Sequence, residues 1–247
     1  MADRYYLYGI FPAPGPSELE VEGLDKQCVR SHTLNRFAFL YSETGQERYL
    51  ASRKNLLGHE KVLEEAMRCG HRTLLPLQFG LIIESWEQVV QQLVETQGAG
   101  LQQLFERLEG RREVSVKVLW DQAAELETLM QENESLRQER DALEGKQLSM
   151  DQVISIGQGI EQAVNARKEG IVAAFRATLN PLAVEALEND PMMDSMIYNA
   201  AYLIDWEDEP SFNQAIEALD AQFEARLRIR YNNFTAPYNF AQLDQLD

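Results

Sequence analysis

The 247-residue sequence is poor in the residues that most often carry disulfides, metal sites and catalysis, with only two cysteines and three histidines. Two cysteines cannot form a disulfide framework, and a chain of this length can bury a core without one. No apolar run approaches the roughly 20 residues that span a bilayer. The start, MADRYYLYGIF, lacks the pattern of a secretory signal peptide. These absences predict a soluble intracellular protein.

The sequence also lacks the short motifs of nucleotide-binding and hydrolytic enzymes, including a P-loop and a nucleophile elbow. Gly157 and Gly159 lack the third glycine of a dinucleotide fingerprint and fall inside a helical pattern, so close helix packing explains them better. Cys69 and His71 have no second ligand pair at metal spacing, and His59 has no partner histidine of a zincin motif. We therefore expect no enzyme activity, no cofactor and no metal site.

Basic residues are scarce relative to acidic ones, 23 against 40, which gives a formal net charge of −17. A general nucleic-acid binder needs a basic footprint, so this balance argues against nucleic acid as a partner. The acid is unevenly placed, because residues 1–110 have a net charge of −4 and residues 111–247 a net charge of −13. This difference and the chain length predict two domains with a boundary near residue 110.

The first predicted domain, residues 1–110, alternates strand patterns with helical ones. Aromatic and apolar residues at every second position favour strands, and Ser52 is a candidate N-cap for the first helix. This mixture is typical of an α+β domain. The predicted elements are strands at 4–10, 26–31, 34–42 and 72–83, the last interrupted at Pro76 and Gly80, and helices at 53–68, 86–93 and 100–108.

The second predicted domain, residues 111–247, opens with the clearest strand pattern of the chain, EVSVKVLW. Leucines recur every seven residues at 129, 136 and 143 but do not extend into a full coiled-coil seam. A helix pair packed within the chain is therefore preferred, and a projecting arm used in assembly stays an open alternative. The element order predicts a modified ferredoxin-like sheet with a helical insertion at about 121–190. The predicted elements are strands at 113–120, 193–206 and 226–231, and helices at 121–144, 151–177, 181–188 and 209–225.

The chain ends with RLRIRYNNFTAPYNF, in which arginines alternate with apolar residues before an aromatic tail. In a strand the arginines share one face, and Lys117 of the neighbouring first strand would lie on the same face. This basic stripe predicts either a docking face for another protein or pairing with acidic helices of the same chain. The aromatic tail could add affinity for a partner or could pin the tail within its own chain. The candidate docking residues are Lys117, Arg226, Arg228, Arg230, Phe234, Pro237, Tyr238 and Phe240.

Four segments, in this order and spacing, resemble the GvpL/GvpF family of gas-vesicle proteins: YYLYGI, RTLLPLQFG, EVSVKVLW and IRYNNFTAPYNF. The resemblance covers nearly the whole chain. The sequence departs from the family pattern at Gln78, where a basic residue is common, at 232–234, and at Ala236.

The resemblance implies a non-enzymatic accessory or minor structural protein of gas vesicles, located at the vesicle within the cytoplasm. It implies as partners the major shell protein and other accessory vesicle proteins, and neither nucleic acid nor a lipid membrane. The implied fold has two α+β domains, the second with an added helical region. A small-molecule-binding regulatory module on a ferredoxin-like domain is the alternative, and it predicts a closed apolar pocket with a few polar groups.

Overall fold

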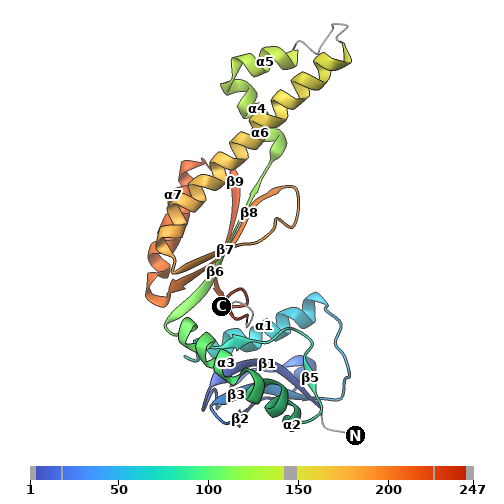
Figure 1. The fold of residues 1–247 in the computed structure, drawn as a ribbon, viewed down its shortest axis with the longest axis vertical. Helices are drawn as coiled ribbons and strands as arrows, with labels where there is room; N and C mark the ends of the chain where they lie inside the picture. Colours follow the sequence, from blue (N-terminus) through green and yellow to red (C-terminus); the bar gives the residue numbers. More distant parts are fainter. Residues whose placement is uncertain (1–3, 18, 142–148, 225, 243–247) are drawn as a thin grey trace. The chain divides into compact units, whose positions relative to one another are not determined.

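The computed structural model describes residues 4–17, 19–141, 149–224 and 226–242. The chain divides into two compact units, and both contain sheets and helices (Figure 1). Unit 1 comprises Met1–Val114, Leu203–Trp206 and Asn233–Asp247, and unit 2 comprises Ser115–Tyr202 and Glu207–Asn232. The predicted α+β class is confirmed, and the domain boundary near residue 110 stays a prediction.

Unit 1 is built on a five-stranded antiparallel sheet. The strand order is β2-β3-β1-β4, and β5 also pairs with β1. β1 consists mostly of aromatic and apolar residues, which suits a position at the centre of the sheet. Six of its nine residues are buried there. The strands are β1 (Arg4–Pro12), β2 (Val29–Leu34), β3 (Phe37–Thr44), β4 (Leu75–Pro76) and β5 (Ile82–Ile83).

Two predicted strand boundaries in unit 1 are wrong for reasons of backbone conformation. The strand predicted from residue 26 begins at Val29, after a short 3₁₀ turn. The strand predicted from residue 34 begins at Phe37, because Asn35 turns the chain with a φ of 55°. The interruption predicted at Gly80 within 72–83 is confirmed, because Gly80 has a φ of 95° and separates two short strands, the first of which ends at Pro76.

Helices cover both faces of this sheet. Alternation along β3 sends Ala38 and Leu40 to one face, where they pack with Val62 and Leu63 of α1 (Arg53–Arg68). Phe37 lies on the opposite face and stacks on Phe105 of α3 (Glu95–Leu108), with ring centroids 6.0 Å apart. Ser52 caps α1, as predicted, by accepting a hydrogen bond from Asn55 N. The gap predicted at 94–99 is absent, because a π-helical turn (Val90–Val94) joins α2 (Trp86–Val89) to α3.

The register of β1 shifts between Leu7 and Gly9, and the space at Gly9 is filled by neighbours. A Cβ there would lie 2.8 Å from Leu63 Cδ2 and 3.1 Å from the carbonyl oxygen of Leu75. We expect Gly9→Ala to lower the free energy of unfolding by about 1–3 kcal/mol, measured by urea denaturation. Gly45→Ala is the control, since no atom lies within 4 Å of a Cβ at that position. Equal effects of the two substitutions would contradict the close packing.

The second sheet has four strands in the order β7-β8-β6-β9. Its strands are β6 (Arg111–Trp120), β7 (Glu185–Glu188), β8 (Met196–Asp205) and β9 (Leu227–Thr235), and the ends of three of them are counted with unit 1. The helix predicted at 181–188 is wrong. A 3₁₀ turn at Asn180–Leu182 ends at Ala183, whose backbone is extended, and β7 then pairs with β8.

Two helices pack their apolar side chains against the sheet residues of unit 2. Phe175 of α6 (Met150–Leu179) contacts Tyr198, and Phe212 of α7 (Glu209–Gln222) contacts Tyr202. Burying each such side chain stabilises the fold by about 1.5–3 kcal/mol. Ser149 begins α6 with a capping box in which it exchanges hydrogen bonds with Gln152.

The helix predicted at 121–144 is two helices, α4 (Gln122–Glu132) and α5 (Glu134–Asp141). They are separated at Asn133, where φ is −117° and ψ is 97°. Both contact α6, so the predicted pairing of helices within the chain is confirmed (Figure 1). The rest of the predicted helix, with Leu143, lies outside the described residues. Within the part of the chain that the structure describes, no helix combines the length and the apolarity needed to cross a membrane.

Candidate interaction surfaces

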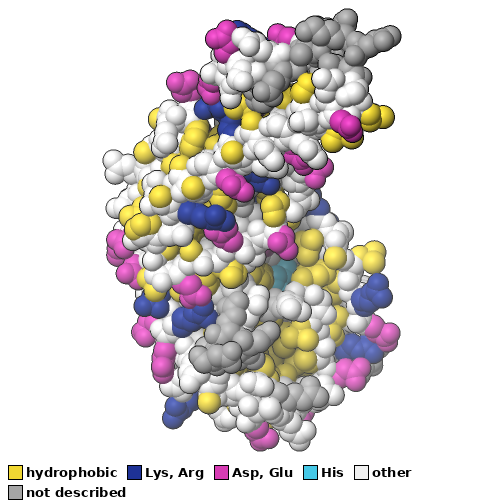
Figure 2. All heavy atoms as spheres, turned by 45° about the horizontal axis from the view of Figure 1, so that its top comes forward, with side chains coloured by type: hydrophobic (Ala, Val, Ile, Leu, Met, Phe, Trp, Pro, Cys, Tyr) yellow, Lys and Arg dark blue, Asp and Glu magenta, His cyan; other side chains and the backbone are white. Residues whose placement is uncertain are grey.

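On the surface of the protein, basic side chains lie among acidic ones (Figure 2). On the face shown in Figure 2, acidic and basic groups are interspersed with apolar ones. A binding surface must therefore be found from the partners of individual charges, not from a field of one sign.

The four basic residues of the predicted stripe all lie in unit 2, on β6 and on or next to β9. Arg226 is engaged within the unit, because its Nη1 lies 3.1 Å from Oε2 of Glu125. Glu125 is only 3% exposed and also binds Arg167, with Nε 2.6 Å from Oε2. The prediction that arginines pair with the chain's own acidic helices therefore holds for Arg226.

Arg228 and Arg230 are exposed, and Lys117 is half-buried. None of the three forms an ion pair with any residue that the structure describes. The residues that alternate with the arginines along β9 point inward, since Leu227 is 5% exposed and Tyr231 stacks on Phe212. The predicted alternation along β9 is confirmed, and it leaves two arginine side chains available to solvent.

A small pocket lies beside this basic group and consists of unit 2 residues. Its volume is about 330 Å³, and Arg228 and Asp121 give it charges of both signs. It is lined by Leu119, Trp120, Asp121, Ser195, Arg226, Leu227 and Arg228.

The aromatic residues of the predicted docking set lie in unit 1 and are largely packed there. Phe240 is 1% exposed, Pro237 is buried, and Tyr238 packs against the core that contains Tyr6 and Val62. Phe234 has the guanidinium of Arg68 5.2 Å from its ring centroid. These contacts agree with the predicted intramolecular role of the tail, and contact with a partner stays a prediction.

Two carboxylates fasten this tail, the buried Glu113 and the half-buried Glu60, and neither has a local signal in the sequence. Glu113, which is 3% exposed, accepts hydrogen bonds from Asn239 N at 2.8 Å and Asn239 Nδ2 at 2.6 Å. Glu60 accepts one from Thr235 Oγ1 at 2.9 Å. Burial raises the pKa of Glu113 to about 7 and also raises the pKa of Glu60.

Trp206 adds a cation–aromatic contact in unit 1 that the sequence did not reveal. The guanidinium carbons of Arg72 and Arg112 lie 4.3 and 4.4 Å from its ring centroid. Arg112 also donates to the carbonyl oxygen of Asn233, at the start of the tail segment. Such contacts contribute about 0.5–2 kcal/mol each and join segments that are distant in sequence.

The residues of the YYLYGI and RTLLPLQFG segments meet in the core of unit 1. The hydroxyl of Tyr6 lies 2.8 Å from His59 Nδ1 and accepts a hydrogen bond from Gly80 N at 3.1 Å. The hydroxyl of Tyr8 accepts one from Leu24 N at 2.8 Å. Both tyrosine hydroxyls are hydrogen-bonded within the core, so a structural role explains both segments.

The histidines and cysteines form no catalytic arrangement among the described residues. His59 is 2% exposed, and burial lowers its pKa to about 4. His32 stacks on Trp86 with ring centroids 4.0 Å apart. Both cysteines are free and exposed, and no group of three or more potential metal ligands occurs in the ranges the structure describes.

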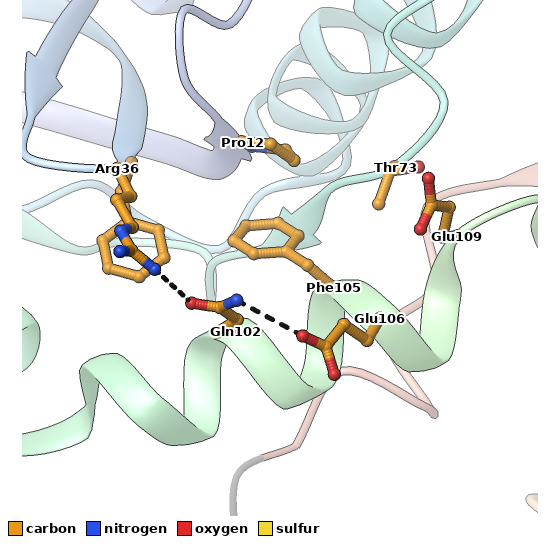
Figure 3. A pocket seen from close by; sticks show the side chains of 8 residues that line it. Pro12, Arg36, Thr73, Gln102, Phe105, Glu106 and Glu109 are labelled. Carbon is orange, nitrogen blue, oxygen red and sulfur yellow. Dashed lines mark hydrogen bonds between the residues drawn. The ribbon is translucent and has the colours of Figure 1, made fainter.

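Figure 3 shows a second pocket, formed by residues of unit 1, with a volume of about 280 Å³. Phe37, Phe105 and Pro12 are its apolar lining residues, and five of its lining side chains are exposed. Arg36 Nη1 donates to Gln102 Oε1 at 3.1 Å, and Gln102 Nε2 donates to Glu106 Oε1 at 3.3 Å. The lining residues are Pro12, Arg36, Phe37, Thr73, Gln102, Phe105, Glu106 and Glu109.

Comparison with known proteins gives consistent matches over nearly the full chain. Gas vesicle protein F of Nostoc sp. (strain PCC 7120) is 56% identical over 243 residues, which is 98% of this chain and 100% of the relative. Gas vesicle protein F of Dolichospermum flosaquae is 56% identical over 99% of this chain and 100% of the relative.

Two solved structures have the same fold as this chain. The crystal structure of the gas vesicle protein GvpF from Anabaena sp. PCC7120 superposes with a TM-score of 0.85 at 53% identity, covering 97% of this chain and 96% of that one. GvpF from Microcystis aeruginosa gives a TM-score of 0.84 at 53% identity, covering 98% and 100%. The model of the family described as gas vesicle synthesis protein GvpL/GvpF matches residues 4–242. The chain therefore belongs to the GvpL/GvpF family of gas vesicle synthesis proteins.

Proposed function

We propose that this protein, a non-enzymatic member of its family, binds shell or accessory proteins while gas vesicles are assembled. The observation that carries the proposal is the pair of exposed arginines on β9, Arg228 and Arg230, which have no ion-pair partner among the described residues. A guanidinium binds carboxylates through two parallel hydrogen bonds, so such a pair suits an acidic segment of a partner.

The partners in this proposal are the major gas-vesicle shell protein and other accessory vesicle proteins, and the place of action is the gas vesicle within the cytoplasm. Lys117 lies on the neighbouring strand β6 and extends the proposed contact. Arg226 lies next to the proposed contact and is held in position by its ion pair with Glu125. In this proposal the aromatic tail is a latch that keeps the end of the chain folded. Its residues are Phe234, Pro237, Tyr238 and Phe240.

We also propose that the second sheet follows the ferredoxin-like plan, within a C-terminal domain that starts near residue 111. Support comes from the order of elements, in which one strand, a helical segment, two strands, a helix and a last strand follow each other. The spatial order β7-β8-β6-β9 places the first and last strands side by side, as that plan requires. The helices α4, α5 and α6 then form the proposed insertion.

The test is a pull-down of the major shell protein and accessory vesicle proteins with the full chain and the double variant Arg228→Glu, Arg230→Glu. Because exposed ion pairs contribute about 0.2–1 kcal/mol each and reversal adds repulsion, we expect binding to weaken about tenfold. The control is Arg53→Glu with Lys54→Glu, two exposed residues of α1 with the same change in charge. Binding by the β9 variant equal to that of the control would contradict the proposal.

A further inference from the structure

The pocket of unit 1 shown in Figure 3 has an apolar floor made of two stacked aromatic rings. Phe37 and Phe105 are 6% and 8% exposed, and their planes are inclined by 30°. The volume of about 280 Å³ lies just below the 300–1,000 Å³ of pockets that hold drug-sized ligands. The space therefore suits one side chain better than a cofactor.

One end of the pocket is acidic. Glu106 and Glu109 lie on the last turn and at the C-terminal cap of α3, where the helix dipole also favours a cation. Glu109 forms no hydrogen bond or ion pair with a residue in the described part of the chain. Glu106 accepts only the weak bond from the Gln102 amide there. Arg111 follows this end of α3 in the chain, but its guanidinium donates to the carbonyl oxygen of Arg107, at 2.8 Å, and not to either carboxylate.

The opposite end of the pocket is held by Arg36, which lies at the turn between β2 and β3. Its bond to Gln102, and that of Gln102 to Glu106, connect three of the lining side chains in a chain of hydrogen bonds (Figure 3). The pocket is thus polarised, with a guanidinium at one end and two carboxylates at the other.

We propose that this pocket binds the side chain of an arginine or lysine presented by a partner protein. The aliphatic stem would lie on Phe105, the cationic head would meet Glu106 and Glu109, and Arg36 would face the backbone carbonyl of the bound residue. An aromatic face with carboxylates beside it is the arrangement that recognises organic cations. The inference extends the proposed binding role but concerns other residues, so either can fail without the other.

The probe for the first test is N-acetyl-L-argininamide, titrated into the full chain while the backbone amide signals of 102–110 are followed by NMR. The control probe is N-acetyl-L-citrullinamide, which has nearly the same shape and no charge. We expect saturable shifts with the arginine probe and at least about fivefold weaker binding of the citrulline probe. Equal binding of the two probes, or no saturable shift with the arginine probe, would overturn the proposal.

The second test asks whether the carboxylates of the pocket bind the probe. Glu106→Gln with Glu109→Gln should weaken binding of the arginine probe about five- to tenfold, and folding should be preserved because both residues are exposed. Glu95→Gln makes the same kind of substitution on the first turn of α3 and should leave binding unchanged. Unchanged binding by the double variant would also overturn the proposal.

A third comparison distinguishes a residue of a partner protein from free arginine. Free L-arginine carries an α-amino group and an α-carboxylate, which a residue within a chain lacks. A protein-derived ligand predicts that the capped probe binds at least as tightly as free arginine. A free amino acid that binds tenfold more tightly than the capped probe would overturn the assignment to a partner protein.

Discussion

Replacing Phe240 with alanine should lower the free energy of unfolding of unit 1 by about 3–5 kcal/mol. Phe240 is 1% exposed, and its neighbour in the tail, Ala236, is 0% exposed and belongs to the core of unit 1. Removing the ring therefore leaves a cavity inside the unit. The measurement is native-state hydrogen exchange of the β1 amides. The free energy of opening derived from their protection factors should fall by the same amount as the stability.

The control for this experiment is Arg228→Ala, because Arg228 is exposed and has no ion-pair partner among the residues described. A surface substitution of this kind changes stability by less than about 0.5 kcal/mol. If Phe240→Ala left the protection of β1 as high as this control does, the tail would not be part of the core of unit 1.

This role of Phe240 also decides how partner binding should be tested. Cutting the chain after Tyr231 would remove Phe240, Tyr238 and the Glu113–Asn239 hydrogen bonds together. A loss of binding after such a cut would report on the folding of unit 1 as well as on the tail itself. Point substitutions of exposed residues, such as Arg228 and Arg230, avoid this ambiguity.

Elements with strong local signals could be predicted from the sequence. Ser52 and Ser149 both cap helices, since a serine side chain can accept a hydrogen bond from the first turn. The alternation of valine with polar residues in β6, and of arginine with apolar residues in β9, marks the buried face of each strand. In these cases the physical cause lies within a few residues of its effect.

β7 could not be predicted, because its residues favour another structure locally. Glu185, Ala186, Leu187 and Glu188 are all good helix formers. They form a strand through pairing with β8, and Glu188 also binds Arg176 of α6 with N–O distances of 2.6 Å. Tertiary contacts of this kind override weak local preference.

The polar groups that hold the tail could not be predicted for a similar reason. Glu113 and Asn239 are separated by 126 residues, and Glu60 and Thr235 by 175. In the sequence Glu113 is one acidic residue among 40, so nothing distinguished it from a solvated charge. The exposed arginines of the candidate docking surface, by contrast, could be predicted, because the alternation within one strand is enough to place them on its exposed face.

The buried carboxylate of Glu113 should make the stability of unit 1 depend on pH. Burial raises its pKa to about 7, against roughly 4.3 in the unfolded chain. The native state then binds the proton more tightly than the unfolded state does. This contribution is fully present below about pH 4.3 and is lost as the pH rises through 7, an effect of roughly 2–4 kcal/mol. Glu60, whose pKa is also raised by burial, acts in the same direction.

His59 opposes this trend in an overlapping range of pH. Burial lowers its pKa to about 4, from roughly 6.5 in the unfolded chain, so its contribution to stability is present above pH 6.5 and lost as the pH falls toward 4. Between pH 4.5 and 6.5 the two groups therefore partly cancel, and the pH profile of the wild-type chain alone cannot reveal either. A comparison with Glu113→Gln separates them, because that variant keeps His59 and cannot titrate at 113.

We expect the stability of the wild-type chain minus that of Glu113→Gln to fall by roughly 2–3 kcal/mol between pH 5 and pH 8. The measurement is urea denaturation in a Trp120→Phe background, which leaves fluorescence from Trp86 and Trp206 of unit 1. Any packing or hydrogen-bond loss caused by the glutamine is the same at both pH values and cancels in this difference. Glu95→Gln, at an exposed site, should show no such change. A difference that stays constant with pH would mean that Glu113 ionises as an exposed glutamate does, and that proton binding at Glu113 does not stabilise the docked tail.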